Sequence, residues 1–595
     1  MTQRKRSLHL LLPLSLLVAC GTSGDTTSSS TPPTVEPSSN DAAASRPAPA
    51  ASNASADAGV ADAAATPPCP SNGSWSSLVP GPGQAGFDAT LASSVERYDR
   101  LHDALFTKAT GLAGSLQVTS DPAQRAKIET LLSTPWAPTD TDPTDDLLQY
   151  TGLDPMAFVT SWGMGTGMYA GTELAADAFR YGVLRDRGGD CTAVARARKM
   201  LDLGLDALHV VVSITGRPGS IARGIARADL PGDGASPVTP LVDSAGKALP
   251  PEKDNGSWRA DNSGLYPNLV WIDSCSRDML FGWTMGAASL WEVIKDDPTF
   301  DAAKKARLQG DMKAVLDGLR IVRAGGKDLE LWDADDRPTF HGFLHESSAD
   351  RVYALTNGPA ALMALGQVAA LVSIVDDASS KAYLSTLVGA RGLPDAIAQS
   401  LALVGLSGDQ ANHSGYNMLF LTGWLAHRYV GDGAARGKIK SGLLTQLYSP
   451  LFGEKPSDWK QSLYDFIAAT ASGDGWLGAP VKKTFDAVAV ANGLSSLVAF
   501  RPAPLVPSTV ENCDAAESAS GLCTLSDGVT TVKVKTVDGA LVANKAIPMA
   551  LRPPSNFYWR SDPHLVNGAG SPNAFMPGSD LRVAYWLGRY VRVAP

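Results

Sequence analysis

The chain has 595 residues, of which 44% are hydrophobic and 19% charged, and its formal net charge at pH 7 is −9. This length and apolar content allow one large domain or two to three ordinary ones, with an ample core. The charge balance is mildly acidic and no basic stripe or run occurs, which argues against a nucleic-acid partner.

The N-terminus has the pattern of an export signal. The basic segment Arg4-Lys5-Arg6 precedes an apolar run from Leu8 to Val18 that is too short to span a bilayer. The run ends in Leu17-Val18-Ala19-Cys20-Gly21, which resembles the bacterial lipobox. The resemblance implies a signal peptide over residues 1–19, lipidation of Cys20 and, in a Gram-negative cell, sorting to the outer membrane. An ordinary signal peptide with an incidental cysteine is the alternative.

Residues 20–70 consist almost entirely of Ser, Thr, Ala, Pro, Asn, Asp and Gly. Such a segment cannot bury enough apolar surface to offset its ordering entropy, so we expect a disordered tether. We find no later stretch long and apolar enough to cross a membrane. The lipid would then be the only anchor, with the folded part outside the cytoplasm.

Residues 71–505 carry a succession of helix signals. After a helical region from Leu91 to Leu132, segments of about 10–25 residues have one apolar face and are separated by Gly, Pro, Asn or Asp. These segments are Glu173–Leu184, Cys191–Val212, Val270–Ile294, Asp301–Val322, Val352–Val375, Lys381–Val404, Tyr416–Val430, Ile439–Tyr448, Trp459–Thr470 and Phe485–Phe500. Sparse strand signals disfavour a doubly wound α/β fold. Because long polar loops recur after every second helix, we expect a mainly α fold, an (α/α) toroid of helical hairpins; a helical bundle is the alternative.

After Pro502, helix signals give way to strand and turn signals. Residues Val529–Thr536 alternate, Asp538-Gly539 is a hairpin-turn signal, and Leu541–Leu551 can return as a second strand. We therefore expect residues 506–595 to form a small β appendage whose tail packs back on the toroid. An independent β domain is the alternative.

Five cysteines follow Cys20, and export permits disulfides. Cys513 and Cys523 are close in sequence and flanked by loop formers, so we predict that they pair. A bond between Cys191 and Cys275 remains open. No CxxC occurs, which disfavours a thiol-rich zinc site, and we expect no metal and no cofactor.

The segment Asp273–Asp278, reading D-S-C-S-R-D, is the first functional candidate. Short hydroxyl and carboxylate side chains before an apolar helix are typical of an N-cap, but Arg277 and Asp278 in the same turn exceed what capping needs. We predict that Asp278 is catalytic and that Arg277 binds substrate. Gly282 and Gly286, further along this helix, are interpreted as close-packing positions.

A second polar segment runs from His341 to Asp350. His341 and His345 would share a helix face, as paired zinc ligands do, but Gly342 weakens such a helix and the HExxH and HxxEH orders are absent. We interpret the segment as a polar loop at a cleft, with Glu346 catalytic and with His345 and Asp350 binding substrate. The nearby Asp333-Ala334-Asp335-Asp336 is interpreted as a solvated loop or a calcium-binding turn.

A third polar segment, Asn412–Asn417, opens a helix. His413 and Tyr416 are predicted to be catalytic and Asn417 to bind substrate. Arg223 could present its guanidinium to a carboxylate such as a uronic acid, with an ordinary salt bridge as the alternative. Trp271 could stack on a sugar ring, with core packing as the alternative.

Together, the helices and their recurring polar loops resemble the (α/α) toroid proteins of carbohydrate metabolism: polysaccharide lyases, helical-barrel glycoside hydrolases and sugar epimerases. The resemblance covers residues 172–500, is architectural, and implies a cell-surface glycan-active enzyme.

Two mechanisms fit this resemblance. An inverting hydrolase needs two carboxyl groups about 6.5–9.5 Å apart, which Asp278 with Glu346 or Asp350 could supply. A lyase needs a cation or amide at a uronate and a Tyr or His to move the α-proton, which Arg223 or Arg277 with the His413–Tyr416 segment could supply. The alternative is a non-catalytic surface lipoprotein that binds glycan or scaffolds an envelope complex, in which these residues would be dispersed among separate structural partners.

Overall fold

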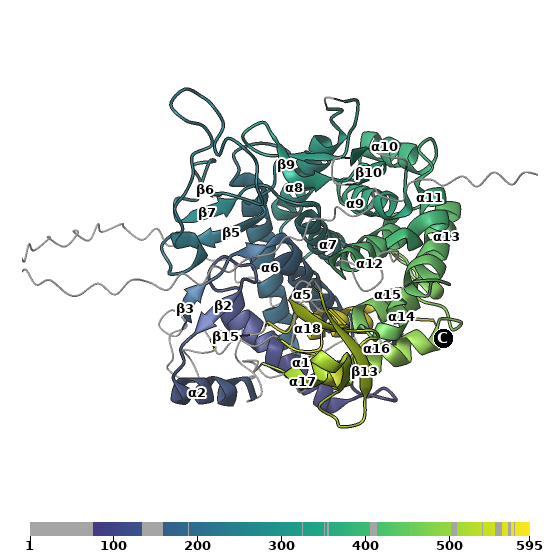
Figure 1. Cartoon of the computed structure of the whole chain (residues 1–595). Coiled ribbons are helices and arrows are strands. Elements are labelled where there is room, and N and C mark those ends of the chain that lie inside the picture. The colour runs from purple at the N-terminus through teal and green to yellow at the C-terminus, as the bar shows by residue number, and fades with distance from the viewer. Residues whose placement is uncertain are drawn as a thin grey trace, which may run out of the picture. The chain divides into compact units, whose positions relative to one another are not determined.

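The computed structural model describes a mainly helical protein (Figure 1). The described residues are 75–133, 159–187, 190–323, 325–349, 352–353, 356–404, 413–453, 455–500, 509–537, 539–553, 562–568, 573–575 and 577–594. All of them belong to one unit that runs from Cys69 to Pro595. The predicted signal peptide, Cys20, the tether and Asp350 lie outside the described residues.

Six helices of the described chain are buried along most of their length, and we call them the inner helices. They are α5 (Gly167–Arg187), α7 (Arg277–Ile294), α9 (Gly358–Val375), α12 (His413–Tyr429), α15 (Ser462–Ser472) and α18 (Ser579–Tyr590). Helices with apolar or small residues on all sides need a neighbour on every face. Each inner helix contacts the next along the chain, α7 also contacts α12, and α18 contacts α5. The order of contacts therefore closes on itself.

Most of the other longer helices precede or lie between the inner ones in the sequence, two of them between α9 and α12, and are buried on one face. They are α1 (Ala89–Leu101), α6 (Cys191–Ser213), α8 (Ala302–Arg320), α10 (Ala378–Val388), α11 (Leu393–Ser400), α13 (Gly433–Gly442) and α16 (Ala487–Phe500). Among them, α6 packs on α5, α8 and α11 pack on α9, and α16 packs on α15. Alternation of buried and half-buried helices agrees with the predicted succession of helical hairpins.

Most strands lie in the connections that enter inner helices. A four-stranded antiparallel sheet, in the order β4 (Gly165–Thr166), β5 (Gly224–Arg227), β7 (Leu269–Ile272) and β6 (Trp258–Ala260), precedes α7 and begins just before α5. The pair β8 (Glu330–Trp332) and β9 (Pro338–Phe343) precedes α9. The three strands β12 (Leu522–Thr524), β13 (Thr531–Val537) and β14 (Ala540–Ala543) precede α18. These long connections therefore all end at the N-terminal ends of inner helices.

The structure differs from the prediction in the limits of several helices and strands. The segment predicted as one helix from Val270 is strand β7 followed by a turn, and the helix begins at Arg277. The predicted hairpin is confirmed, with Val537 opposite Ala540 in the antiparallel register of β13 and β14. The tail that was expected only to pack back on the toroid is α18, one of the inner helices.

Helix α9 corrects the expectation that no late segment could cross a membrane. Its 18 residues are long and apolar enough by length and composition, and 72% of them are buried inside the protein. It contacts α12, α8 and α11. A helix that is apolar all round is also what a core position requires, and this packing explains its composition.

Glycines let α5 and α7 pack backbone to backbone. A Cβ atom on Gly282 would collide with the carbonyl oxygen of Gly167, and one on Gly171 would collide with that of Gly282. A Cβ on Gly286 would lie 2.7 Å from the carbonyl oxygen of Gly171. The interpretation of Gly282 and Gly286 as close-packing positions is confirmed.

A buried network of charged side chains joins α18 to α5 and α1. Arg582 of α18 has no exposed surface and donates hydrogen bonds to Asp99 of α1 (2.8 Å) and to Asp177 of α5 (2.6 Å). Glu173 of α5 is its third partner. The Nε2 atom of His102 lies 2.9 Å from Oδ2 of Asp177. Ion pairs out of contact with water therefore hold the last inner helix to the first.

Candidate functional site

The turn between β7 and α7 is held in place by the β8–β9 pair. Ser274 has a left-handed φ of 59° and is fully buried. Its N–H donates to Oδ2 of Asp333 at 2.8 Å, and its Oγ accepts a hydrogen bond from the N–H of Phe340 at 3.1 Å. A non-glycine residue in this region costs on the order of 1–3 kcal/mol and persists where its surroundings fix it. The turn is therefore a rigid element.

Beneath this turn lies a buried ion cluster. Nζ of Lys253 is 2.7 Å from Asp333, 2.9 Å from Asp273 and 2.9 Å from Asp335. Burial raises the pKa of Asp333 to about 6, against the opposing effect of Lys253, and Asp273 raises it further. The interpretation of this aspartate motif as a solvated loop or calcium turn is wrong for Asp333 and Asp335, whose side chains have no exposed surface and already pair with an ammonium group.

Arg223 and Asp278 flank the same turn. Nη1 of Arg223 donates to Asn255 at 3.0 Å and to the Oγ of Ser276, the N-cap residue of α7, at 3.1 Å. Within the described part of the chain, the Nε and Nη2 groups of its guanidinium have no acceptor. Asp278 lies in the first turn of α7, where the helix dipole favours an anion; it is 8% exposed. Arg277 is the first residue of α7 and is half-buried.

The N-terminal ends of α5, α7 and α12 contact one another. The N–H of Met168 points at the sulfur of Met279, 3.3 Å away, and the side-chain amide of Asn417 points at the sulfur of Met168, 3.5 Å away. Oδ1 of Asn417 is buried and accepts no hydrogen bond from any described residue. These contacts place Asn417 and its neighbour Tyr416 at the same end of the inner helices as Asp278.

Aromatic rings surround His413 at the start of α12. Its Nε2 lies 3.2 Å from Oδ1 of Asp562. Its ring stacks on that of His564, with centroids 5.6 Å apart, and meets Trp459 edge-on at 5.2 Å. Tyr416 is buried, with its ring 4.7 Å from Trp459. The C-terminal segment thus contributes Asp562 and His564, which sequence reasoning did not select although both lie in one short polar run.

Asp465, near the start of α15, was also not selected. It is fully buried, its Oδ1 accepts a hydrogen bond from the hydroxyl of Tyr448 at 2.7 Å, and its Oδ2 has no partner among the described residues. Burial raises the pKa of Asp465 to about 8. It is therefore a carboxylic acid at neutral pH, a state that a sequence does not reveal.

The His345–Glu346 pair has its own structural partners. Arg391 donates from Nε to Oε1 of Glu346 at 2.8 Å and binds the second carboxylate oxygen through Nη2. The same guanidinium lies 2.8 Å from Asp328. Nδ1 of His345 accepts the N–H of Ser347 at 3.2 Å, and burial lowers the pKa of His345. Glu346 is thus engaged by Arg391, and its pairing with Asp278 in a hydrolase stays a prediction.

Two further predictions are corrected by burial. Trp271 has no exposed surface, and its indole N–H donates to the carbonyl of Ala260 at 2.9 Å, so it is a core residue that cannot stack on a sugar. Cys275 is a buried free thiol, whose pKa burial raises, and Cys191 is disulfide-bonded. The alternative that joined these two cysteines is wrong.

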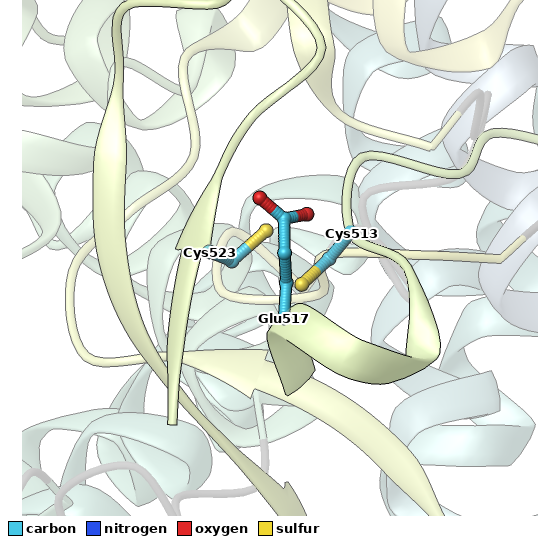
Figure 2. Close-up of side chains that lie close together, drawn as sticks. All are labelled: Cys513, Glu517 and Cys523. Atoms are coloured by element: carbon cyan, nitrogen blue, oxygen red, sulfur yellow. The ribbon is translucent and has the colours of Figure 1, made fainter. Parts of the chain in front are cut away.

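Cys513 and Cys523 are free thiols in the structure, so the predicted disulfide is not formed in it. Their sulfur atoms and a carboxylate oxygen of Glu517 lie within 4.8 Å of one another (Figure 2). His102, Asp103 and Asp177 form a second such group. There, Arg180 and Arg582 already bind the carboxylates, which leaves Cys513, Glu517 and Cys523 as the better candidate metal ligands among the described residues.

No family model and no curated protein match the chain. Among solved structures, an endoglucanase from the termite Nasutitermes takasagoensis is similar with a TM-score of 0.35 and 11% sequence identity, over 84% of this chain and 98% of that one. A similarity of this size carries no argument about the reaction.

Proposed function

We propose that the chain is a glycan-active enzyme built on an (α/α) toroid. The closed order of contacts among six inner helices supports the toroid, as does the alternation with half-buried helices. The observation that carries the function is the gathering of Asp278, Tyr416 and Asn417 at the N-terminal ends of contacting inner helices. The long connections also lead into the inner helices at these ends. This supports a toroid with one open end that is lined by loops.

Among glycan reactions, the side chains favour elimination from an acidic polysaccharide. Tyr416 and His413 would act as the acid–base pair. The Nε and Nη2 groups of Arg223, which have no acceptor among the described residues, the amide of Asn417 and the nearby helix N-termini would stabilise the uronate carboxylate as charge develops on it. Removal of the α-proton forms a C=C bond from the C–H electron pair, the glycosidic C–O bond breaks, and the leaving oxygen takes up a proton.

A non-catalytic glycan-binding or scaffolding role is the second candidate. It is supported by the His345–Glu346 pair, whose polar atoms are engaged by Arg391 and Ser347 as expected for residues with a structural task. Asp278 with Asp350 as the acid pair of a hydrolase remains a proposal, because Asp350 lies outside the described residues.

The deciding experiment incubates the purified full chain with a panel of acidic and neutral polysaccharides. New reducing ends with ultraviolet absorbance from an unsaturated uronate would support elimination. New reducing ends without that absorbance would replace elimination by hydrolysis. Binding without any new ends across the panel would overturn the enzymatic proposal in favour of the second candidate.

We also propose that Cys20 is lipidated and anchors the protein in the cell envelope, at the outer membrane of a Gram-negative cell. The lipobox-like segment and the apolar run before it support this. Mass spectrometry of the mature N-terminal peptide would detect the lipid. An unmodified Cys20, or a Cys20→Ser variant that stays in the membrane fraction, would contradict it.

A further inference from the structure

The C-terminal strands have a small core of their own. Its buried members lie in or beside the β12–β14 sheet and are Cys513, Cys523, Leu525, Val532, Val534, Ala543, Ile547 and Val566. This core is separate from the large one around the inner helices. Small cores supply little stability by themselves and are commonly supplemented by a disulfide or a structural metal ion. Two of the eight residues are cysteines, so either a disulfide or a metal ion could stabilise this core.

Three potential ligand atoms converge in this core (Figure 2). Cys513 precedes the short helix α17 (Ala515–Ser520), Glu517 lies on that helix, and Cys523 is on β12. The two sulfur atoms and a Glu517 oxygen lie within 4.8 Å of one another. Around one tetrahedral zinc ion, with Zn–S of about 2.3 Å and Zn–O of about 2.0 Å, ligand atoms lie about 3.5–3.8 Å apart. Small side-chain movements would therefore suffice.

The charge around the thiols distinguishes this arrangement from an ordinary disulfide site. Asp514 and Glu517 are both acidic and form the capping box of α17, in which Oδ1 of Asp514 accepts the N–H of Glu517 at 2.8 Å. Within the described residues neither is paired with Lys, Arg or His. The hydrogen bonds that Glu517 accepts from described residues are long, at 3.4 Å from the N–H of Asp514 and 3.5 Å from that of Thr524. A disulfide is neutral and gains nothing from an adjacent carboxylate, whereas a cation bound by the thiolates would be stabilised by it.

Access and burial also suit a metal ion. The side chains of Cys513 and Cys523 are 4% and 1% exposed, while Glu517 is half-buried and opens toward solvent.

We propose that Cys513, Cys523 and Glu517 bind a thiophilic divalent metal ion such as Zn²⁺, which joins α17 to β12. Two thiolates and one carboxylate are suitable zinc ligands, and a water molecule would complete the tetrahedron. The ion would stabilise the small C-terminal core. This inference is independent of the proposed glycan chemistry, because no residue of the site is shared.

The test uses the reduced full chain under anaerobic conditions, with Co²⁺ as a spectroscopic probe. Stoichiometric Co²⁺ should give a thiolate charge-transfer band that Zn²⁺ then removes by displacement. Cys513→Ser and Cys523→Ser should abolish the band, and Glu517→Gln should weaken Co²⁺ binding at least about 10-fold. Cys275→Ser removes a buried thiol elsewhere and is the matched control, with the band unchanged.

Two results would overturn the proposal. One is the absence of a charge-transfer band although thiol titration finds Cys513 and Cys523 reduced. The other comes from trapping the thiols of freshly isolated protein with an alkylating reagent. Recovery of a Cys513–Cys523 disulfide peptide, in place of two alkylated cysteines, would show that the pair is oxidised and holds no metal.

Discussion

Burial, together with the presence or absence of a paired cation, decides the charge of the buried carboxyl groups. Among the described residues, the carboxyl group of Asp465 accepts a hydrogen bond from Tyr448 alone, and burial raises its pKa to about 8. For Asp335, burial also raises the pKa, but Arg337 and Lys253 outweigh it and the pKa is lowered. The difference lies in the cations, since an unpaired buried carboxylate is far more costly than a paired one. Buried residues of one type therefore have different protonation states in the same protein.

The first prediction concerns Asp465→Asn. The raised pKa means that at pH 4–8 the native state holds a proton that the unfolded state, with a pKa near 3.8, has lost. The free energy of unfolding should therefore fall as pH rises from about 4 to 8, on the order of a few kcal/mol.

Asparagine retains the acceptor for Tyr448 and removes this dependence, so the variant should gain stability relative to wild type as pH rises. Urea unfolding at pH 5 and pH 8 measures the difference. The exposed Asp458→Asn is the control. An equal pH dependence in wild type and Asp465→Asn would show that Asp465 is ionised in the native state.

The second prediction follows from the proposed elimination. Tyr416→Phe keeps the ring against Trp459 and removes the hydroxyl, so kcat on the substrate found in the panel should fall about 100-fold or more with little change in KM. Tyr590→Phe is the control. The hydroxyl of Tyr590 donates to Glu292 at 2.8 Å, and Tyr590 is the last residue of α18, whereas Tyr416 lies near the start of α12. That variant should retain kcat. Full activity of Tyr416→Phe would remove Tyr416 from the mechanism.

At the scale of elements, glycine spacing sets how α5 and α7 cross. Gly167, Gly171 and Gly282 put backbone against backbone, which fixes the N-terminal end of α7 beside that of α5. The turn that carries Asp278 is fixed a second time by Asp333 and Phe340 from the next connection. Helix packing and loop contacts thus jointly position one candidate residue.

The third prediction compares two glycine substitutions in helices. Gly282→Ala places a methyl group against the backbone of α5, which cannot move aside as a flexible side chain would, and should destabilise the protein by about 3 kcal/mol. Gly310→Ala in α8 meets no atom within 4 Å and should stabilise by about 0.5–1 kcal/mol through helix propensity. Chemical denaturation of both variants measures the contrast. Equal effects would mean that α5 and α7 are not in backbone contact.

At the scale of the whole molecule, the described unit depends on contacts between residues distant in sequence. Arg582 lies in the last inner helix, and its partners Asp99, Glu173 and Asp177 lie in the first helices. Bringing residues this far apart in sequence together costs loop-closure entropy, which the buried ion pairs help to offset. The two ends of the unit therefore stabilise each other.

The fourth prediction tests these ion pairs. Arg582→Leu leaves buried carboxylates without their cation and should cost about 3–5 kcal/mol. Arg592→Leu removes a guanidinium that is 51% exposed and pairs with Asp186, and should cost no more than about 1 kcal/mol. Thermal and urea unfolding of the full chain distinguish the two. A small loss for Arg582→Leu would mean that the buried carboxyl groups take up protons instead.

The pattern of apolar residues by itself determined the mainly helical fold, the C-terminal hairpin and the packing role of Gly282. These features follow from local periodicity and from turn chemistry, which neighbouring residues carry. Helix starts were less predictable: Val270 to Ile272 are apolar enough to continue a helix, and only pairing with β5 and β6 makes them a strand.

Only the tertiary structure decided which polar residues contact one another. It joined Lys253 to Asp333, Glu346 to Arg391 and His413 to Asp562, over separations that no spacing rule covers. It also buried Trp271 and brought Cys513, Glu517 and Cys523 together without a CxxC motif. Burial and ion pairing are properties of the packed chain, because each depends on surfaces that meet only after the helices have assembled.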